Sequence, residues 1–223
     1  MKFNSSLNLR SAIFAMTLVI TPQMVNAQQS IGFGIHASPL AGWFTSSNSN
    51  IEGKGATAGF NFGLTYNKYF GENYAFSTGI SLITAGGSLS SSDTIVLQSK
   101  KLIEPGRKSV YHIRYLAVPI GLKLRSNQIG YISIFTNIGL DPKFILGGKV
   151  EVPTQSIAKE NADNMLSRLS MGYHVTGGIE YSLGGTTSVA LGINFDSNFT
   201  DIIKQPAAKV SHKMIGLHLG LNF

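Results

Sequence analysis

The sequence predicts an all-β fold in which eight antiparallel strands close into an up-and-down barrel that crosses a membrane. Four observations support this prediction. Apolar and polar residues alternate along most of the chain, and short and long connections alternate between the strand-like segments. Beyond the first residues, no segment approaches the roughly 18 to 20 continuous apolar residues of a membrane helix. Charged residues make up only 13% of the chain, and glycine is abundant at 25 residues.

The amino terminus predicts a secretory signal peptide over residues 1–27. Lys2 and Arg10 give a positive start, an apolar stretch covers 12–20, and small residues end the segment at 25–27. The apolar stretch is too short to span a bilayer, although an uncleaved membrane anchor is the alternative. Cleavage leaves residues 28–223 as one barrel domain. The absence of cysteine excludes a lipoprotein signal, disulfides and thiolate metal sites.

Eight segments have the period-two alternation of half-buried strands. It is clearest in the last segment, where Ile215, Leu217 and Leu219 alternate with glycine and histidine. Pro119 lies within the fourth segment and predicts a bulge or kink there. In the fifth segment the isoleucines compete with Tyr131 and Phe135 for the apolar face, so its register stays open. We place the strands at 30–43, 55–69, 74–88, 110–126, 129–146, 169–183, 187–199 and 210–223.

The connections between these segments fall into two classes. Three are tight turns, at 70–74, 126–128 and 184–186. Four are longer, at about 44–54, 89–109, 147–168 and 200–209, and Thr154 could cap a short helix in the third of them. A membrane barrel built from hairpins has this alternation, with short turns on the periplasmic side and long loops outside.

The composition of the two faces favours a barrel with its apolar side outward. The other face is rich in glycine, which suits a crowded interior, and it carries few of the Lys and Glu residues expected on a wet sheet. Aromatic residues also gather at the strand ends, as in membrane barrels. One rim would hold Tyr66, Tyr69, Phe70, Tyr74, Phe76 and Phe223, and the other Trp43, Phe44, Tyr111, Phe144 and Phe199. The alternative is a soluble, lipocalin-like barrel that binds an apolar ligand inside.

An eight-stranded barrel is only wide enough for its own side chains, so we expect a packed polar interior and no open pore. The candidates for this interior network are Lys123, His174, Glu180, Asp196 and His218. If 184–186 is a three-residue turn, His174 and Asp196 lie opposite each other, and we hypothesise that they interact.

A His–Asp pair also suggests a lipid-modifying enzyme, with Ser170 as the nearest candidate nucleophile. No sequence pattern marks one serine among the many, so we favour a histidine with satisfied hydrogen bonds and a protein that is not an enzyme. His112 and His212 are expected in rims or loops. The sequence contains no HExxH, phosphate-loop or calcium-loop pattern, and no cofactor or metal is expected.

The second long connection carries a basic patch of Lys100, Lys101, Arg107 and Lys108. Facing outward, these cations could meet the phosphates of lipopolysaccharide, and the alternative is a solvated run of charges. Outer-membrane lipid and an unknown protein at the loops are therefore the expected partners. The predicted compartment excludes nucleic acid as a partner.

The segment from Ile113 to Arg125 resembles a segment of PorT-like outer-membrane barrels of Bacteroidetes, which are small OmpX-like barrels. The matching positions are Tyr115, Leu116, Val118, Pro119 and Lys123, whereas Ala117 stands where that family usually has Glu. The resemblance implies a structural or interaction role in the outer membrane of a Gram-negative bacterium, with a link to protein secretion. The terminal Phe223 resembles the signal that the barrel assembly machinery reads.

Overall fold

A computed structural model describes residues 31–96, 101–155, 157–204 and 210–223. The predicted signal peptide (1–27) and Lys100 of the basic patch lie outside these residues. Within the described part of the chain, no helix is long and apolar enough to cross a membrane.

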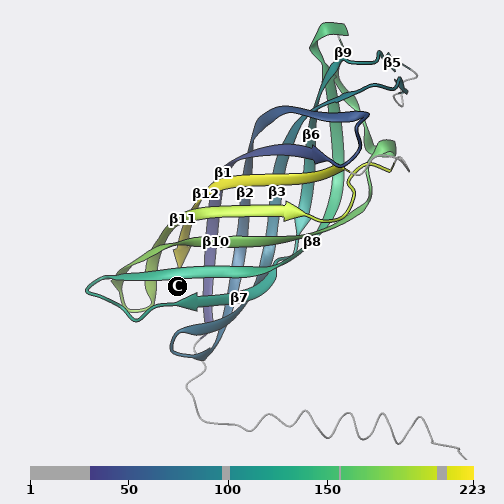
Figure 1. Cartoon of the computed structure of the whole chain (residues 1–223). Helices are drawn as coiled ribbons and strands as arrows, with labels where there is room; N and C mark the ends of the chain where they lie inside the picture. The colour runs from purple at the N-terminus through teal and green to yellow at the C-terminus, as the bar shows by residue number, and fades with distance from the viewer. Residues whose placement is uncertain (1–30, 97–100, 156, 205–209) are drawn as a thin grey trace, which may run out of the picture.

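The strands form one closed antiparallel ring, which confirms the predicted fold (Figure 1). The ring has eight strand positions, which we call staves. β6 and β7 are two halves of one stave, because both pair with β3 and β8. The bounds are β1 Ile31–Ser46, β2 Ile51–Gly71, β3 Tyr74–Ser91, β6 Lys108–Ala117, β7 Ile120–Arg125, β8 Ile132–Val152, β10 Leu169–Gly184, β11 Thr187–Asn198 and β12 Val210–Asn222. Three short strands lie outside the ring: β4 Ile95–Val96, β5 Leu102–Ile103 and β9 Ile157–Asn161.

Pro119 interrupts the fourth stave, as the sequence predicted. β6 ends at Ala117, β7 begins at Ile120, and the two residues between them lie outside the ladder. The Val118 N–H still donates to the carbonyl of Pro142 on β8, 3.0 Å away. Proline has no N–H to donate, so the ladder is interrupted here, while the register with β3 and β8 is the same on both sides of the break.

The predicted long connections need correction. β1 reaches Ser46 and β2 begins at Ile51, so the first is a short turn. The predicted helix beginning at Thr154 is wrong: the third connection contains 3₁₀ turns at Pro153–Gln155 and Asp163–Met165, with β9 between them. β9 pairs with β8 from Lys149↔Asn161 to Val152↔Ile157, so backbone groups that a helix would have bonded internally are bonded in the ladder instead.

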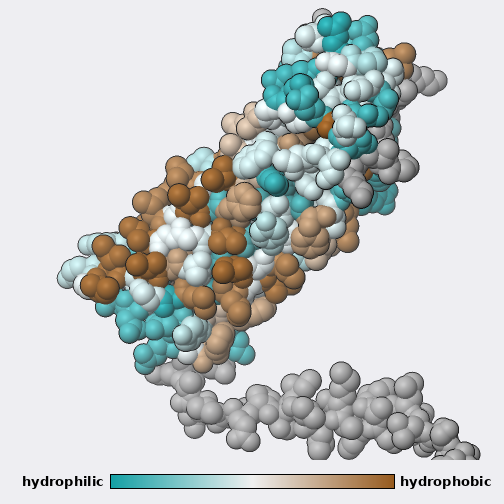
Figure 2. Space-filling model, in the orientation of Figure 1, coloured by the Kyte–Doolittle hydropathy of each residue, from teal (hydrophilic) through white to brown (hydrophobic). Residues whose placement is uncertain are grey.

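An apolar band surrounds the half of the barrel nearer the chain termini (Figure 2). Its side chains point outward from every stave, including Leu64, Ile80, Ile134, Leu191 and Leu217, each about half exposed or more. Ile132, Ile134 and Ile138 of β8 face outward and Phe135 faces inward, which settles the register that the sequence left open. An exposed apolar surface of this extent is explained by lipid contact, since soluble monomers rarely expose one.

Beyond the band, the two faces of the strands exchange character. On β3 the outward side chains change from Leu82 to Thr84, while the inward ones change from Ser81 to Ile83. On β12 the outward change is from Ile215 to Lys213. We call the described residues of 42–57, 86–114, 147–168 and 200–212 the head. Outside the band the strands meet water, so the apolar side chains turn inward as in a soluble sheet.

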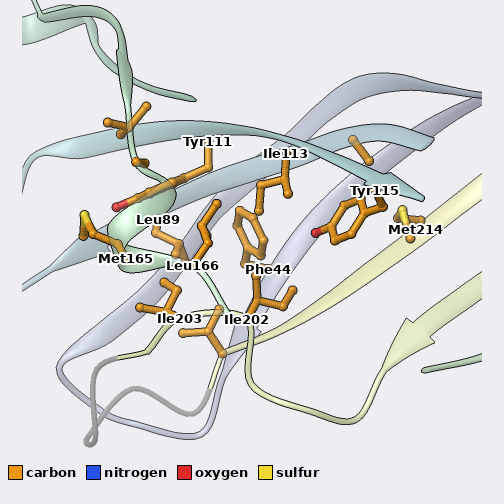
Figure 3. Packing of buried hydrophobic residues seen from close by; sticks show 14 of the residues in the cluster. Phe44, Leu89, Tyr111, Ile113, Tyr115, Met165, Leu166, Ile202, Ile203 and Met214 are labelled. Atoms are coloured by element: carbon orange, nitrogen blue, oxygen red, sulfur yellow. The ribbon is translucent and has the colours of Figure 1, made fainter. Parts of the chain in front are cut away.

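The head has its own hydrophobic core (Figure 3). Leu166 and Met165 from the segment before β10 pack with Ile202 and Ile203 from the connection before β12. Phe44 and Tyr111, which the sequence placed in an aromatic rim, are 4% and 2% exposed and lie inside this core. The rim prediction failed for them because the inward face becomes apolar above the band.

Glycines let neighbouring strands approach closely inside the ring. A Cβ added at Gly178, which faces Gly192, would lie 2.2 Å from the Leu191 carbonyl oxygen. The adjacent Gly177 points outward, and a Cβ there meets nothing within 4 Å.

We expect Gly178→Ala to destabilise the barrel by about 1–3 kcal/mol, because backbone atoms must shift to admit the methyl group. Gly177→Ala is the matched control and should change stability little. The measurement is the folded fraction across a urea series, read from the different gel mobility of unboiled and boiled protein. Equal losses for the two variants would contradict the close approach.

Candidate functional site

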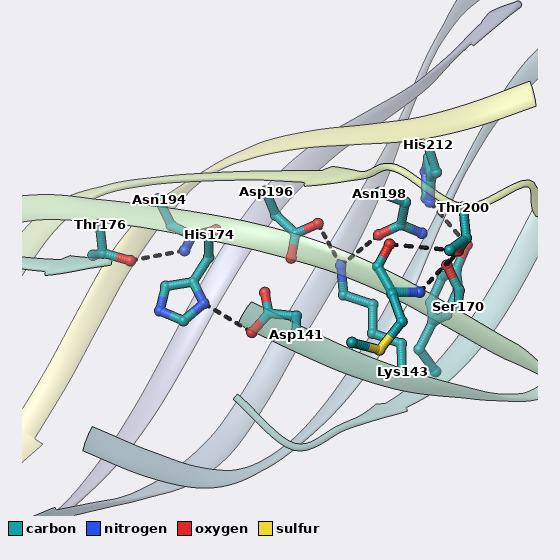
Figure 4. A network of polar contacts seen from close by, with 12 residues as sticks. Asp141, Lys143, Ser170, His174, Thr176, Asn194, Asp196, Asn198, Thr200 and His212 are labelled. Carbon is teal, nitrogen blue, oxygen red and sulfur yellow. Dashed lines mark hydrogen bonds and ion pairs between the residues drawn. The ribbon is translucent and has the colours of Figure 1, made fainter. Parts of the chain in front are cut away.

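The barrel interior contains a buried ionic network where the band meets the head (Figure 4). Lys143 of β8 is fully buried, and its Nζ donates to Asp196 Oδ1 and, at 2.7 Å, to Asn198 Oδ1, both on β11. Ser170 is equally buried, and its hydroxyl lies 3.1 Å from that of Thr200. A buried ammonium group is tolerated only when it is paired and hydrogen-bonded, and here both conditions are met.

A second group of polar side chains lies deeper in the band. His174 Nδ1 donates to Asp141 Oδ1 at 2.8 Å, and its Nε2 lies 3.3 Å from Asn137 Oδ1. Asn137 Nδ2 donates to the Ser77 hydroxyl at 3.1 Å, which links β8 to β3 across the barrel. These contacts hold the imidazole between β8 and β10 with both ring nitrogens engaged.

A third group lies at the end that carries the chain termini. Lys123 of β7 donates to Glu180 of β10, and Asn222 of β12 donates to the same carboxylate at 3.1 Å. Arg125 Nη1 lies 3.8 Å from the second oxygen of Glu180. This group therefore ties three staves together around one buried carboxylate.

The structure places the five predicted interior residues inside the barrel. Lys123, His174, Glu180 and Asp196 are buried, and His218 is half-buried with its ring centroid 5.4 Å from that of His36. The register does bring His174 opposite Asp196. Their side chains nevertheless have separate partners, Asp141 for the histidine and Lys143 for the aspartate.

Asp141, Lys143 and His212 are among the interior residues that sequence reasoning missed. Asp141 and Lys143 lie on β8, whose register was left open; they continue the inward alternation that includes Ser133 and Phe135. His212, expected in a rim or loop, is fully buried: its Nδ1 accepts from the Tyr115 hydroxyl at 2.8 Å and its Nε2 donates to the Gly86 carbonyl at 3.1 Å. Extending the alternation of the last strand to residue 212 would have found it.

Two small cavities lie among the described residues of the interior. One of about 70 Å³ is lined by His36, Asp141 and His174, and another of about 40 Å³ by Lys123 and Glu180. A wider vestibule of about 570 Å³ lies at the terminal end. Cavities of the first two sizes have room for a few water molecules, so the described interior is a filled barrel rather than a solute pore.

The remaining predicted residues lie at the two ends. Lys101 pairs with Glu160 and Arg107 with Glu104, while Lys108 is exposed. Phe223 is 48% exposed and extends the β1–β12 ladder, since its N–H donates to the Phe33 carbonyl at 2.8 Å. Among the described residues, no group of three or more His, Asp or Glu side chains is placed to hold a metal ion.

We expect Lys143 and Asp196 to be strongly coupled in a double-mutant cycle. Lys143→Met leaves the carboxylate buried without its cation and should cost about 3–5 kcal/mol. The double variant Lys143→Met/Asp196→Leu should cost less than the two single changes together. Urea unfolding in phospholipid vesicles, followed through the single tryptophan, Trp43, provides the measurement.

The control cycle pairs His174→Gln with Asp196→Leu. Its coupling should be smaller, because the two side chains have different partners. If the His174 cycle gave the larger coupling energy, the network described above would be wrong and the hypothesis drawn from the register would be right.

Three solved structures are among those similar to this chain. Neisserial surface protein A is 10% identical, with 86% of this chain and 97% of that one covered and a TM-score of 0.46. Ail of Yersinia pestis is 13% identical, with 86% and 98% covered and a TM-score of 0.42. OprG of Pseudomonas aeruginosa is 13% identical, with 86% and 96% covered and a TM-score of 0.43. No curated protein matches the sequence.

The family assignment comes from the sequence. A family model described as "Outer membrane protein beta-barrel domain" matches residues 26–204, most of the chain. The closed ring and its outward apolar band agree with that description. The chain therefore belongs to the outer-membrane β-barrel domain family, and its place is the outer membrane.

Proposed function

We propose that this protein is a non-enzymatic outer-membrane barrel that holds a folded head outside the cell as an interaction surface. The observation that carries the proposal is the position of the hydrophobic core, which lies in the head beyond the apolar band. The connections contribute buried side chains to it, among them Ile103, Leu166 and Ile202 at 2% exposure or less. A packed surface binds a partner with little loss of conformational entropy.

The orientation of the barrel supports an outward head. The turns at Glu72–Asn73 and Gly185–Thr186 are short and lie at the same end as the chain termini. Membrane barrels keep short turns and both termini on the periplasmic side. In this proposal residues 1–27 direct export and are removed, and Phe223 is the residue that the assembly machinery reads.

The alternative of a lipid-modifying enzyme has weaker support. The nucleophile proposed for it, Ser170, lies against Thr200, while the imidazole of His174 is held by Asp141 and Asn137. His174 is also 7% exposed and faces the barrel interior rather than the lipid. A nucleophile and its base must be in contact and reachable by substrate, so the geometry favours a structural role for His174.

We propose, more specifically, that the chain is a PorT-like barrel whose head contacts a component of protein secretion in a Bacteroidetes bacterium. The support is the resemblance of residues 113–125. Ala117 departs from that resemblance: its side chain is buried, lines the 70 Å³ cavity and carries no charge there. Deleting the gene should leave secreted proteins inside the cell, as measured in culture supernatants; unchanged secretion would reject this specific role.

We expect Leu166→Ala to loosen the head while leaving the barrel closed. The Leu166 side chain is 2% exposed and packs over Gly148, so its loss should cost about 2–5 kcal/mol in the head. The measurement is protease digestion of whole cells. The wild-type head should resist cleavage, and the variant should be cut there while its gel mobility still shifts on boiling.

Leu217→Ala, on the lipid-facing surface and 54% exposed, is the matched control and should behave as wild type. Rapid cleavage of the wild-type head on whole cells would contradict a folded interaction surface. Cleavage of the variant only after the membrane is permeabilised would show that the head faces the periplasm.

A further inference from the structure

An open cleft of about 410 Å³ lies where the apolar band meets the head. One wall is the edge of β8 at Ile145–Gly147, and the other is the segment 161–168 that leads into β10. The Ile145 N–H donates to the Arg168 carbonyl at 2.9 Å, and the Ala162 N–H donates to the Gly148 carbonyl at 3.0 Å. The cleft is thus closed at both ends by backbone hydrogen bonds.

Cations gather around this cleft. Arg168 and Lys204 line it, both exposed, and neither forms an ion pair with any residue that the structure describes. Arg114 lies beside it, because a Cβ added at the lining residue Gly147 would be 3.7 Å from Arg114 Nη2. The one carboxylate in the lining, Asp163, accepts the Gly148 N–H at 2.7 Å, so three cations face a single acid.

The cleft also borders the lipid. Leu146 lines it and is 55% exposed. Phe144 and Leu169, which are partners in the β8–β10 ladder, lie directly below it and are 49% and 52% exposed. An occupant must therefore offer an anionic group to the cations and hydrocarbon to the band. A soluble anion would satisfy only the first condition.

We propose that this cleft binds a phosphate of lipid A, the membrane anchor of lipopolysaccharide, in the outer leaflet. A guanidinium group and an ammonium group at headgroup depth provide charge-assisted hydrogen bonds to phosphate oxygens. Acyl chains attached to the same sugar would lie along Phe144, Leu146 and Leu169. The basic patch of the second connection is a poorer site, because Lys101 and Arg107 already pair with Glu160 and Glu104.

The test measures binding of the full-length barrel, purified in detergent, to micelles of diphosphorylated lipid A. The double variant Arg168→Gln/Lys204→Gln removes both lining cations but keeps side chains of similar length. It should lose affinity by about tenfold or more, as expected for removed hydrogen bonds from charged groups. The matched control, Arg107→Gln/Lys108→Gln, removes two head cations elsewhere and should bind as wild type. A mobility shift on boiling confirms that each variant is folded.

Two further probes distinguish the ligand. Lipid A with its phosphates removed should bind the wild type as weakly as intact lipid A binds the cleft variant. Vesicles of phosphatidylglycerol should compete poorly, because their phosphodiester carries a single negative charge, whereas a phosphate monoester of lipid A carries close to two and can engage both lining cations. Three results would overturn the proposal. The wild type would bind dephosphorylated lipid A as tightly as intact lipid A, phosphatidylglycerol would compete as well as lipid A does, or the control double variant would lose as much affinity as the cleft variant. None of these outcomes bears on the head, whose test is protease resistance.

Discussion

The rest of the structure depends on one constraint, which is that the medium outside the barrel changes from lipid to water along the length of each strand. In the band, lipid outside leaves the polar side chains only the interior, where they must pair with one another. In the head, water outside sends the apolar side chains inward. On β3 the exchange occurs between Leu82 and Thr84 on the outer face and between Ser81 and Ile83 on the inner face. The ion pairs, the hydrophobic core and the cleft all follow from this inversion.

Two kinds of interaction hold the ring closed: polar contacts in the interior of the band and hydrophobic packing in the core of the head. Within the band, groups such as Lys143 with Asp196 and Lys123 with Glu180 join staves that are not neighbours in sequence. Such pairs add little net stability, since desolvation offsets most of their attraction, but removing one partner is costly because the other is left buried and unpaired. Above the band, side chains from the connections supply ordinary hydrophobic packing. The head is therefore stabilised as a soluble domain is, although its strands continue into the membrane.

Where the band meets the head, cationic side chains lie on the outer face of the barrel. On the outer face, Arg114 and Lys213 are outward, water-facing positions just above the band, and Arg168 immediately precedes the lipid-facing Leu169. In the proposed orientation, cations at this depth would meet the headgroups of the outer leaflet. On the inner face, His212 and Tyr115 form the last hydrogen-bonded pair beneath the hydrophobic core. The same level of the barrel thus carries cations outside and, inside, the His212–Tyr115 contact together with the buried Lys143–Asp196 pair.

The sequence by itself determined the strand alternation, the outward apolar face, the turn that sets His174 opposite Asp196 and the break at Pro119, because these depend on local periodicity and on backbone chemistry. Only the tertiary structure decided which side chains meet across the ring. Asp141 and Lys143 were hidden because β8 has aliphatic or aromatic residues on both faces, and their partners lie more than thirty residues away. The head core was hidden as well, since Phe44 and Leu166 acquire an apolar neighbourhood only when separate connections fold over one another.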